Sequence, residues 1–324
     1  HVFLDNIPNL IIGVTTQEPK YHLLISDLVK LLLSVSFENY FNEYWADILL
    51  TFINSDKDQF FAGLLILINV FQVIIKKKYI NEEGFKTEFT PFIRQLFEKI
   101  TAVYAETELT PFLKAQCILV ATSVVELDPE ICIDPSFMPW YECVESLTTE
   151  DSGFILPLTS ETAYYMSNLV NFFHTCQRKC SKEEIPYASD LFFLCFNIMY
   201  DSSWENESNQ SLIVNVFKFF AYFSKYVSIW EINFLPRLND LIQNVFLPVF
   251  ALPSEAIQLA ETMPVEFINE YHVDFDIIKG PNNNEENSEE EDDSEISSKF
   301  SIEDSETPIS VAFYCLRQIS EKKN

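Results

Sequence analysis

The residues best suited to hold a metal lie in the segment HTCQRKC, which supplies His174, Cys176 and Cys180. Thiolate sulfur and imidazole nitrogen are zinc ligands, and a structural zinc needs four that converge. On a helix, Cys176 and Cys180 would share one face, whereas His174 would lie about 160° away from Cys176. The sequence holds no C-x-x-C or H-x-x-x-H motif that would complete the set. We therefore expect thiols at a helix end and no bound metal.

Carboxylates are concentrated in the segment KGPNNNEENSEEEDDSEISSKFSIEDSET, residues 279–307, which has eleven of them between Glu285 and Glu306 against one lysine. Like charges at this density repel one another and bury no apolar surface, so 281–306 is predicted to be a flexible acidic insertion between helices. Two interpretations stay open: a merely solvated loop, or a docking element that captures a Lys- and Arg-rich partner. The residues that we expect to contact such a partner are Glu285, Glu286, Glu289, Glu290, Glu291, Asp292, Asp293 and Glu295.

Catalytic and cofactor-binding motifs are missing from the sequence. It has only five glycines, too far apart for either Gly-rich phosphate-binding loop, and no G-x-S-x-G motif. Its four histidines offer few carriers for general acid–base chemistry. We expect no catalytic residue, no cofactor and no enzyme activity.

Charge and cysteine content restrict the partners and the compartment. The formal net charge of −28 repels nucleic acid and attracts basic proteins, so we expect no direct nucleic-acid binding. The seven cysteines are an odd number, and most lie inside apolar runs such as LFFLCFNIM, which indicates reduced thiols of a cytosolic or nuclear protein. The sequence begins at His1 without a methionine, and we interpret it as an excerpt of a longer protein.

The segment DQFFAGLLILINVFQVIIKKK, residues 58–78, requires a choice between a membrane span and a core helix. A spanning helix needs about 20 apolar residues. The run from Phe60 to Ile75 has sixteen residues and is interrupted by Asn69 and Gln72, whose amides are costly in hydrocarbon. A helix flanked by neighbours in a stacked array is also apolar nearly all round. We predict a core helix that ends in a lysine cluster, and no membrane insertion.

Glycine scarcity and apolar periodicity both predict an all-α fold. Apolar residues recur with helical spacing in five runs: Leu24, Leu28, Leu31, Leu32 and Val35; Phe92, Ile93, Leu96, Ile100 and Val103; Ala188, Leu191, Phe192, Cys195, Ile198 and Met199; Ile213, Val216, Phe217, Phe220 and Phe223; Leu241, Ile242, Val245, Phe246 and Val249. Helix-start signals stand at Thr110-Pro111, Asp134-Pro135 and Pro253-Ser254.

The helices group into six predicted pairs, at 20–54, 57–104, 109–147, 160–200, 209–250 and 254–321. The pairs begin 37 to 52 residues apart, close to the repeat of about 40–47 residues of HEAT or armadillo helix pairs. A single pair cannot bury its apolar face, but a stack can. We predict one α-solenoid over residues 1–324, with two compact all-α domains as the alternative.

One segment resembles a known family. LIQNVFLPVFALPSEAIQLAETMPVEFINEYHVDFD, residues 241–276, is similar to the part of importin-β superfamily transport receptors in which a helix ending in I/V-x-P leads through an acidic stretch to P-x-E-[FY]-I. The matching residues are Val245, Pro248, Glu255, Glu261, Pro264, Glu266, Phe267 and Ile268. An early segment that precedes Trp45, and FFAGLLILINVFQVIIKKKY after it, resemble that family's early repeats. The likeness is closest to the importin-seven/importin-eight branch, with the cellular-apoptosis-susceptibility exportin next.

The resemblance implies a monomeric HEAT-repeat receptor that shuttles between nucleus and cytoplasm. It implies Ran-GTP, Phe-Gly nucleoporins and a basic protein cargo such as ribosomal proteins or histones as partners. The main Ran site is expected upstream of His1, and the insertion 281–306 is expected to face the concave side and contact Ran or cargo. The alternatives are a HEAT-repeat scaffold without a transport role and an exportin of the same superfamily.

Overall fold

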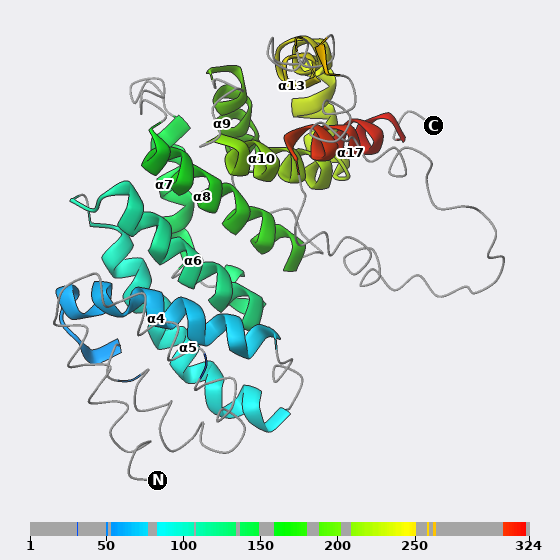
Figure 1. Ribbon diagram of the computed structural model, residues 1–324. Helices are drawn as coiled ribbons and strands as arrows, with labels where there is room; N and C mark the ends of the chain where they lie inside the picture. Colours follow the sequence, from blue (N-terminus) through cyan, green and yellow to red (C-terminus); the bar gives the residue numbers. More distant parts are fainter. Residues whose placement is uncertain are drawn as a thin grey trace. The chain divides into compact units, whose positions relative to one another are not determined.

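The computed structural model describes residues 31, 50, 53–76, 83–106, 108–133, 137–148, 159–179, 188–201, 209–250, 258, 262–263 and 307–321. Every regular element in these ranges is helical, so the all-α prediction is confirmed (Figure 1). The chain divides into two compact units, His1–Leu194 and Cys195–Asn324. The six predicted pairs stay a prediction, because ranges 20–54 and 254–321 lie largely outside the described residues.

Helix α4 (Lys57–Lys76) contains the apolar run of the sequence and packs against α6 (Pro111–Leu127). Its side chains Phe60, Leu64, Leu67 and Phe71 are buried, whereas Gln72 is exposed. Within the described ranges no single helix is both long and apolar enough to cross a membrane. One pair, Gln210–Phe223 with Val227–Phe250, passes that test only jointly, across a bend of 108°.

Helix α6 begins as the sequence predicted. The Thr110 hydroxyl accepts a hydrogen bond from the Leu113 amide at 3.3 Å, and Pro111 occupies the first turn, where its missing N–H costs nothing. Beyond its first turn α6 is buried on nearly every side, because α4, α5 (Glu83–Tyr104) and α8 (Ser160–Lys179) all pack against it. The hydroxyls of Thr122 and Ser123 are satisfied within α6 by the carbonyls of Ile118 and Leu119.

Helix α7 (Met138–Thr148) contributes the centre of the aromatic core in the first unit. Trp140 is fully buried, and its ring centroid lies 4.2 Å from that of Tyr104, 5.0 Å from Phe172 and 6.0 Å from Phe97. These partners come from α5 and α8, so one side chain joins three helices. A short 3₁₀ turn, η4 (Pro129–Ile133), follows α6 and packs against α8.

Helix α9 (Ala188–Asp201) buries all six residues that periodicity assigned to its core face.

The second unit is built on α10 (Gln210–Phe223), which packs against α17 (Pro308–Glu321). The helical segment 227–250 combines α-helical, π-helical and 3₁₀ turns. In chain order these are α11 (Val227–Ile229), the π turn η8 (Trp230–Phe234), the 3₁₀ turn η9 (Leu235–Arg237), α12 (Leu238–Asp240), the π turn η10 (Leu241–Phe246) and α13 (Leu247–Phe250). Helix α17 agrees with the prediction that helix resumes at Pro308.

The core of the second unit consists of stacked rings. The Phe217 and Phe246 centroids lie 5.2 Å apart, and those of Phe250 and Phe313 lie 4.4 Å apart. The prediction that Ile242 is a core residue was wrong, since its side chain is 39% exposed. Residues 241–246 form π-helical turns, whose wider spacing rotates Ile242 away from the face that Leu241 and Val245 share.

Candidate functional site

The predicted partner-binding residues lie mostly outside the described part of the chain. This holds for Glu285, Glu286, Glu289, Glu290, Glu291, Asp292, Asp293 and Glu295, and for the motif residues Pro264, Glu266, Phe267 and Ile268. Pro248 is described: it is half-buried in α13, next to the buried Val249. The assignment of these residues to a partner stays a prediction.

The candidate zinc ligands do not form a described site. His174 and Cys176 lie in α8, with Cys176 fully buried and His174 half-buried, and Cys180 is outside the described ranges. Among the residues that the structure does describe, no group of three or more His, Cys, Asp and Glu side chains could hold a metal ion.

A buried polar cluster joins α5, α7 and α8. The Tyr104 hydroxyl lies 2.8 Å from the Tyr165 hydroxyl and 3.0 Å from the Cys143 sulfur, and Cys143 lies 3.5 Å from the Tyr165 hydroxyl. Burial raises the pKa of Tyr104 and of Tyr165 well above 10.0; Cys143 raises both further, whereas the hydrogen bond with Tyr104 partly lowers the pKa of Tyr165. Both phenols therefore stay neutral at physiological pH, where they exchange hydrogen bonds and position the three helices.

A second buried hydrogen bond lies close to this cluster in the sequence. The indole N–H of Trp140 donates to the Thr101 hydroxyl at 3.0 Å, and that hydroxyl donates to the Phe97 carbonyl at 2.8 Å. Sequence periodicity did not identify the contact between Trp140 and Thr101, because it distinguishes a helix face but not the partner on another helix. What the sequence does contain is the three side chains Tyr104, Trp140 and Tyr165, whose polar atoms need a hydrogen-bond partner when the side chain is buried.

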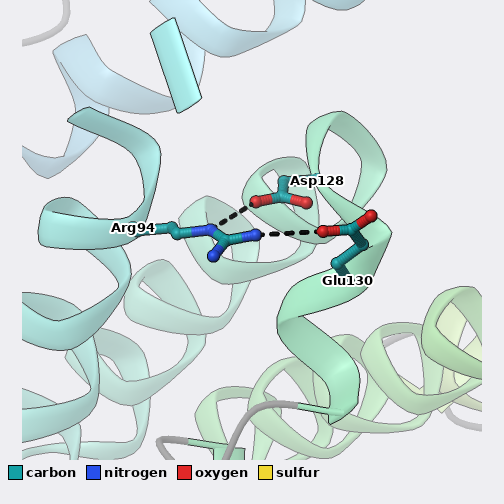
Figure 2. Close-up of polar contacts among 3 residues, drawn as sticks. All are labelled: Arg94, Asp128 and Glu130. Atoms are coloured by element: carbon teal, nitrogen blue, oxygen red, sulfur yellow. Dashed lines mark hydrogen bonds and ion pairs between the residues drawn. The ribbon is translucent and has the colours of Figure 1, made fainter. Parts of the chain in front are cut away.

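An ion-paired clamp connects α5 to the end of α6 and the turn after it. Figure 2 shows Arg94 pointing toward Asp128 and Glu130. Its Nε donates to Asp128 Oδ2 at 3.0 Å, and its Nη2 donates to Glu130 Oε2 at 3.2 Å. The hydrogen bond and charge of Asp128 raise the pKa of Arg94. Arg94 is 46% exposed, so solvent screens the pair and the clamp serves to hold helices together.

Two large rings stand at the surface where α6 and α8 pack side by side. The Phe112 side chain is 47% exposed and the Tyr164 side chain is 40% exposed, and their ring centroids lie 6.1 Å apart at an interplanar angle of 27°. Exposed carboxylates flank them in the sequence, Glu108 before Phe112 and Glu161 before Tyr164. We call these four residues the ring–carboxylate patch. Its two rings were not predicted to be exposed, since no periodic pattern in the sequence distinguishes them from core aromatics.

Buried thiols in both units are poor nucleophiles. Burial raises the pKa of Cys117 from 9.0 to about 12, and it raises the pKa values of Cys195 and Cys315 as well. None of these three thiols can act as a thiolate near neutral pH. This chemistry agrees with the expectation of reduced core cysteines.

Comparison with known proteins gives a fold. No family model matches the chain, and no curated protein sequence matches it. Among solved structures, the chain is similar to "The exportin Cse1 in its cargo-free, cytoplasmic state", with a TM-score of 0.59 and 14% sequence identity. The match covers 98% of this chain and 33% of the exportin, so the chain spans about a third of that protein's length. At this identity the likeness shows the fold alone: the chain has an all-α solenoid architecture similar to that of the matched third of the exportin.

Proposed function

We propose that this chain is part of a nuclear transport receptor that wraps a basic protein cargo and is regulated by Ran-GTP. The observation that carries the proposal is the structural likeness to an exportin along 98% of the chain. The net charge of −28 supports a basic cargo, for which ribosomal proteins and histones are candidates. Assignment to the importin-seven/importin-eight branch, shuttling through nuclear pores and a monomeric state belong to the same proposal.

A stack of helix pairs suits this role physically. Each pair contacts only its neighbours, so small adjustments between pairs accumulate along the stack at a modest energetic cost. A receptor must close around a cargo and release it again. An array of helix pairs can do both through small adjustments between neighbouring pairs, without unfolding any helix. Long-range attraction from a strongly acidic surface also accelerates the encounter with a basic partner.

The acidic insertion 281–306 is the proposed contact for Ran-GTP or cargo. Glu289, Glu290, Glu291, Asp292 and Asp293 form its densest run of charge. Binding through many exposed ion pairs is screened by salt, so affinity is expected to fall steeply as ionic strength rises.

Binding assays with the full-length protein test the proposal against the scaffold alternative. A transport receptor binds Ran-GTP in preference to Ran-GDP and is retained on immobilised Phe-Gly repeats. A HEAT-repeat scaffold outside transport does neither, and absence of both interactions would overturn the proposal. Measurable turnover of any substrate would contradict the expectation that the protein is not an enzyme.

A matched pair of charge variants tests the insertion. The first variant replaces Glu289, Glu290, Glu291, Asp292 and Asp293 with Gln or Asn, and is expected to weaken binding of Ran-GTP or histone at low salt. The control removes the same number of charges from described elements, through Glu98→Gln, Glu142→Gln, Asp190→Asn, Glu231→Gln and Asp240→Asn. If both variants weakened binding equally, the insertion would contribute to binding only through the net charge of the protein.

Order-of-addition binding separates the importin from the exportin of the same superfamily. In an importin, Ran-GTP added to a preformed cargo complex releases the cargo. In an exportin, cargo is retained only when Ran-GTP is present. The exportin in the structural comparison is the reason to include this second arm.

A further inference from the structure

The ring–carboxylate patch (Glu108, Phe112, Glu161 and Tyr164) is the described surface feature with the most specific chemistry. Most of the large aromatic side chains that the structure describes in the first unit are fully buried, including Phe97, Trp140 and Phe172. Phe112 and Tyr164 instead keep 47% and 40% of their surface exposed while stacking on each other. Rings that cost free energy at the surface, and that are held in a fixed pair, indicate an interaction site.

The patch lies where two helices begin. Phe112 is the second residue of α6, and Tyr164 is the fifth residue of α8. Because these N-terminal rings touch, the first turns of α6 and α8 lie next to each other. Figure 1 shows the two helices side by side. Each ring is therefore carried by a helix most of whose residues are buried, which fixes the backbone at both ring positions.

The flanking carboxylates are available to a partner. Glu161 lies three residues before Tyr164 on α8, which makes the two side chains neighbours on the helix surface. Glu108 is exposed in the turn just before Thr110, the N-cap of α6. Neither carboxylate forms an ion pair with any residue in the described ranges.

The local charge is negative despite the two helix N-termini. Each N-terminus contributes roughly +0.5 of an elementary charge, so two of them offset about one of the two carboxylates. The nearest basic residue in the sequence, Lys114, follows Phe112 by two residues and so does not share its face of α6; its Nζ lies 5.8 Å from the centroid of the Tyr104 ring on α5. A cation is therefore the ligand that this surface favours.

We propose that the ring–carboxylate patch binds an arginine side chain of a basic partner segment. A guanidinium is planar, stacks on aromatic faces and pairs with carboxylates through two parallel N–H groups. A lysine ammonium would use the charge but would stack poorly, and an aromatic ligand would use the rings but leave both carboxylates without a role. This inference rests on the proposed binding of basic cargo and adds a preference for arginine over lysine at a defined surface.

The test measures peptide binding to the full-length protein by fluorescence anisotropy. The probes are a labelled peptide with four Arg residues in a Gly/Ser background, the same peptide with Lys for Arg, and the same with Phe for Arg. Two double variants divide the patch: Phe112→Leu with Tyr164→Leu removes the ring faces but keeps an apolar surface, and Glu108→Gln with Glu161→Gln removes the charges. The controls are Tyr200→Leu, at a 60% exposed ring, and Glu98→Gln with Glu142→Gln.

We expect each double variant to weaken the Arg peptide roughly three- to tenfold, the size of one exposed cation–π contact and its ion pairs. In the ring variant, the ratio of Arg-peptide to Lys-peptide affinity should fall toward one. In the control variants, the Arg-peptide affinity and this ratio should stay unchanged. Unchanged Arg-peptide affinity in both double variants would overturn the inference. So would tighter binding of the Phe peptide that depends on the rings but not on the carboxylates.

Photo-crosslinking gives a readout that does not depend on the variants. An Arg peptide with an adjacent diazirine should label residues 108–112 and 160–164 of the unmodified protein, and labelling confined to other surfaces would contradict the inference. The outcomes also separate this site from the proposed function. If only the insertion variant loses Arg-peptide binding, the patch inference fails and the transport proposal stands. If Ran-GTP and Phe-Gly binding are absent while the patch variants behave as expected, the transport proposal fails and the patch inference stands.

Discussion

The helices between residues 57 and 179 and those between 209 and 321 both bury aromatic rings, but different contacts join them. In the first region, the hydroxyls of Tyr104 and Tyr165 meet across two helices, and Trp140 donates to Thr101 across another pair. In the second region, aromatic rings pack across elements, such as Phe217 with Phe246 and Phe250 with Phe313.

The difference concerns how tightly a sequence fixes the register between helices. A buried hydrogen bond has a narrow range of distance and angle, and a partner left unsatisfied is costly, so it permits one arrangement. Apolar rings in contact keep much of their free energy after a small slide or rotation. We therefore expect residues 57–179 to keep one packing arrangement and residues 209–321 to tolerate adjustment.

The largest expected effect is the loss of Trp140. Trp140→Ala should lower the free energy of unfolding of its region by about 4–6 kcal/mol, from the cavity and the lost hydrogen bond to Thr101. Phe217→Ala in the second region should cost about 3–5 kcal/mol, from the cavity, because a phenylalanine side chain has no hydrogen bond to lose. Hydrogen–deuterium exchange in increasing urea measures the two regions separately. A smaller cost for Trp140→Ala than for Phe217→Ala would break the comparison.

Alkaline pH should destabilise the region with buried phenols. The folded-state pKa values of Tyr104 and Tyr165 are raised, so the folded state holds its protons longer than the unfolded state. Stability is therefore fully present below about pH 10, the unfolded value, and is lost as pH rises toward the folded values, by up to about 1.4 kcal/mol per pH unit per tyrosine.

Buried thiols add a decline that begins earlier, because the pKa of Cys117 is raised from 9.0 to about 12 and those of Cys195 and Cys315 are raised too. Urea midpoints measured from pH 8 to pH 11.5 should thus begin to fall above pH 9 and fall more steeply above pH 10, where the phenols add to the thiols. The variant Tyr104→Phe with Tyr165→Phe should lose the steeper part. An identical pH profile in the variant would show that these phenols are not buried in the folded state.

Removing one of the two phenol hydroxyls should cost more than half of the free energy of unfolding that is lost when both are removed. Tyr165→Phe leaves the Tyr104 hydroxyl with Cys143 as a partner and should cost about 1–2 kcal/mol. The double variant leaves neither hydroxyl and should cost less than the sum of the single variants. The double-mutant cycle uses Tyr200→Phe, at a 60% exposed ring, as its neutral control. Strict additivity would mean that the two hydroxyls do not interact.

The smallest effect is expected at the Arg94 clamp. Arg94→Gln removes both ion pairs shown in Figure 2, the part-buried one to Asp128 and the exposed one to Glu130. Because Arg94 itself is 46% exposed, the cost should be about 1 kcal/mol, and the share from Glu130 should be lost in 1 M salt. Arg94→Lys should recover only part of it, since an ammonium cannot reproduce the fork that reaches Asp128 and Glu130 at once. A cost above about 3 kcal/mol would place the clamp among the buried contacts.

Local rules predicted most of the described helices well, because the apolar spacing matches what the structure buries; Leu31, assigned to an apolar face, is an exception at 62% exposed. All five periodic positions from Ile213 to Phe223 are core residues, and Thr110 caps α6 with Pro111 after it. Ile242 was assigned to the wrong face because the π turns of η10 change the period, which no feature of LIQNVF announces. Local chain chemistry therefore predicts an element but not a departure from its standard geometry.

Contacts between helices were beyond such rules. Tyr104 and Tyr165 are 61 residues apart, and only the packing of α5 and α8 brings their hydroxyls together. The ring–carboxylate patch was missed for the same reason, since Phe112 and Tyr164 become a pair only when α6 and α8 align. The acidic insertion is the opposite case, because its proposed role depends on composition and needs no defined partner inside the chain.

The burial of α6 has a consequence for how the protein is synthesised. Its residues from Ala115 to Leu127 are covered largely by α4 and α8, and α8 ends about fifty residues after α6. At a translation rate of about 5–20 residues per second, roughly 3 to 10 seconds pass between the completion of the two helices. During that interval the ribosome carries an apolar helix that lacks one of its neighbours. We expect nascent chains arrested within residues 128–160 to recruit chaperones, and chains arrested well beyond 179 to release them.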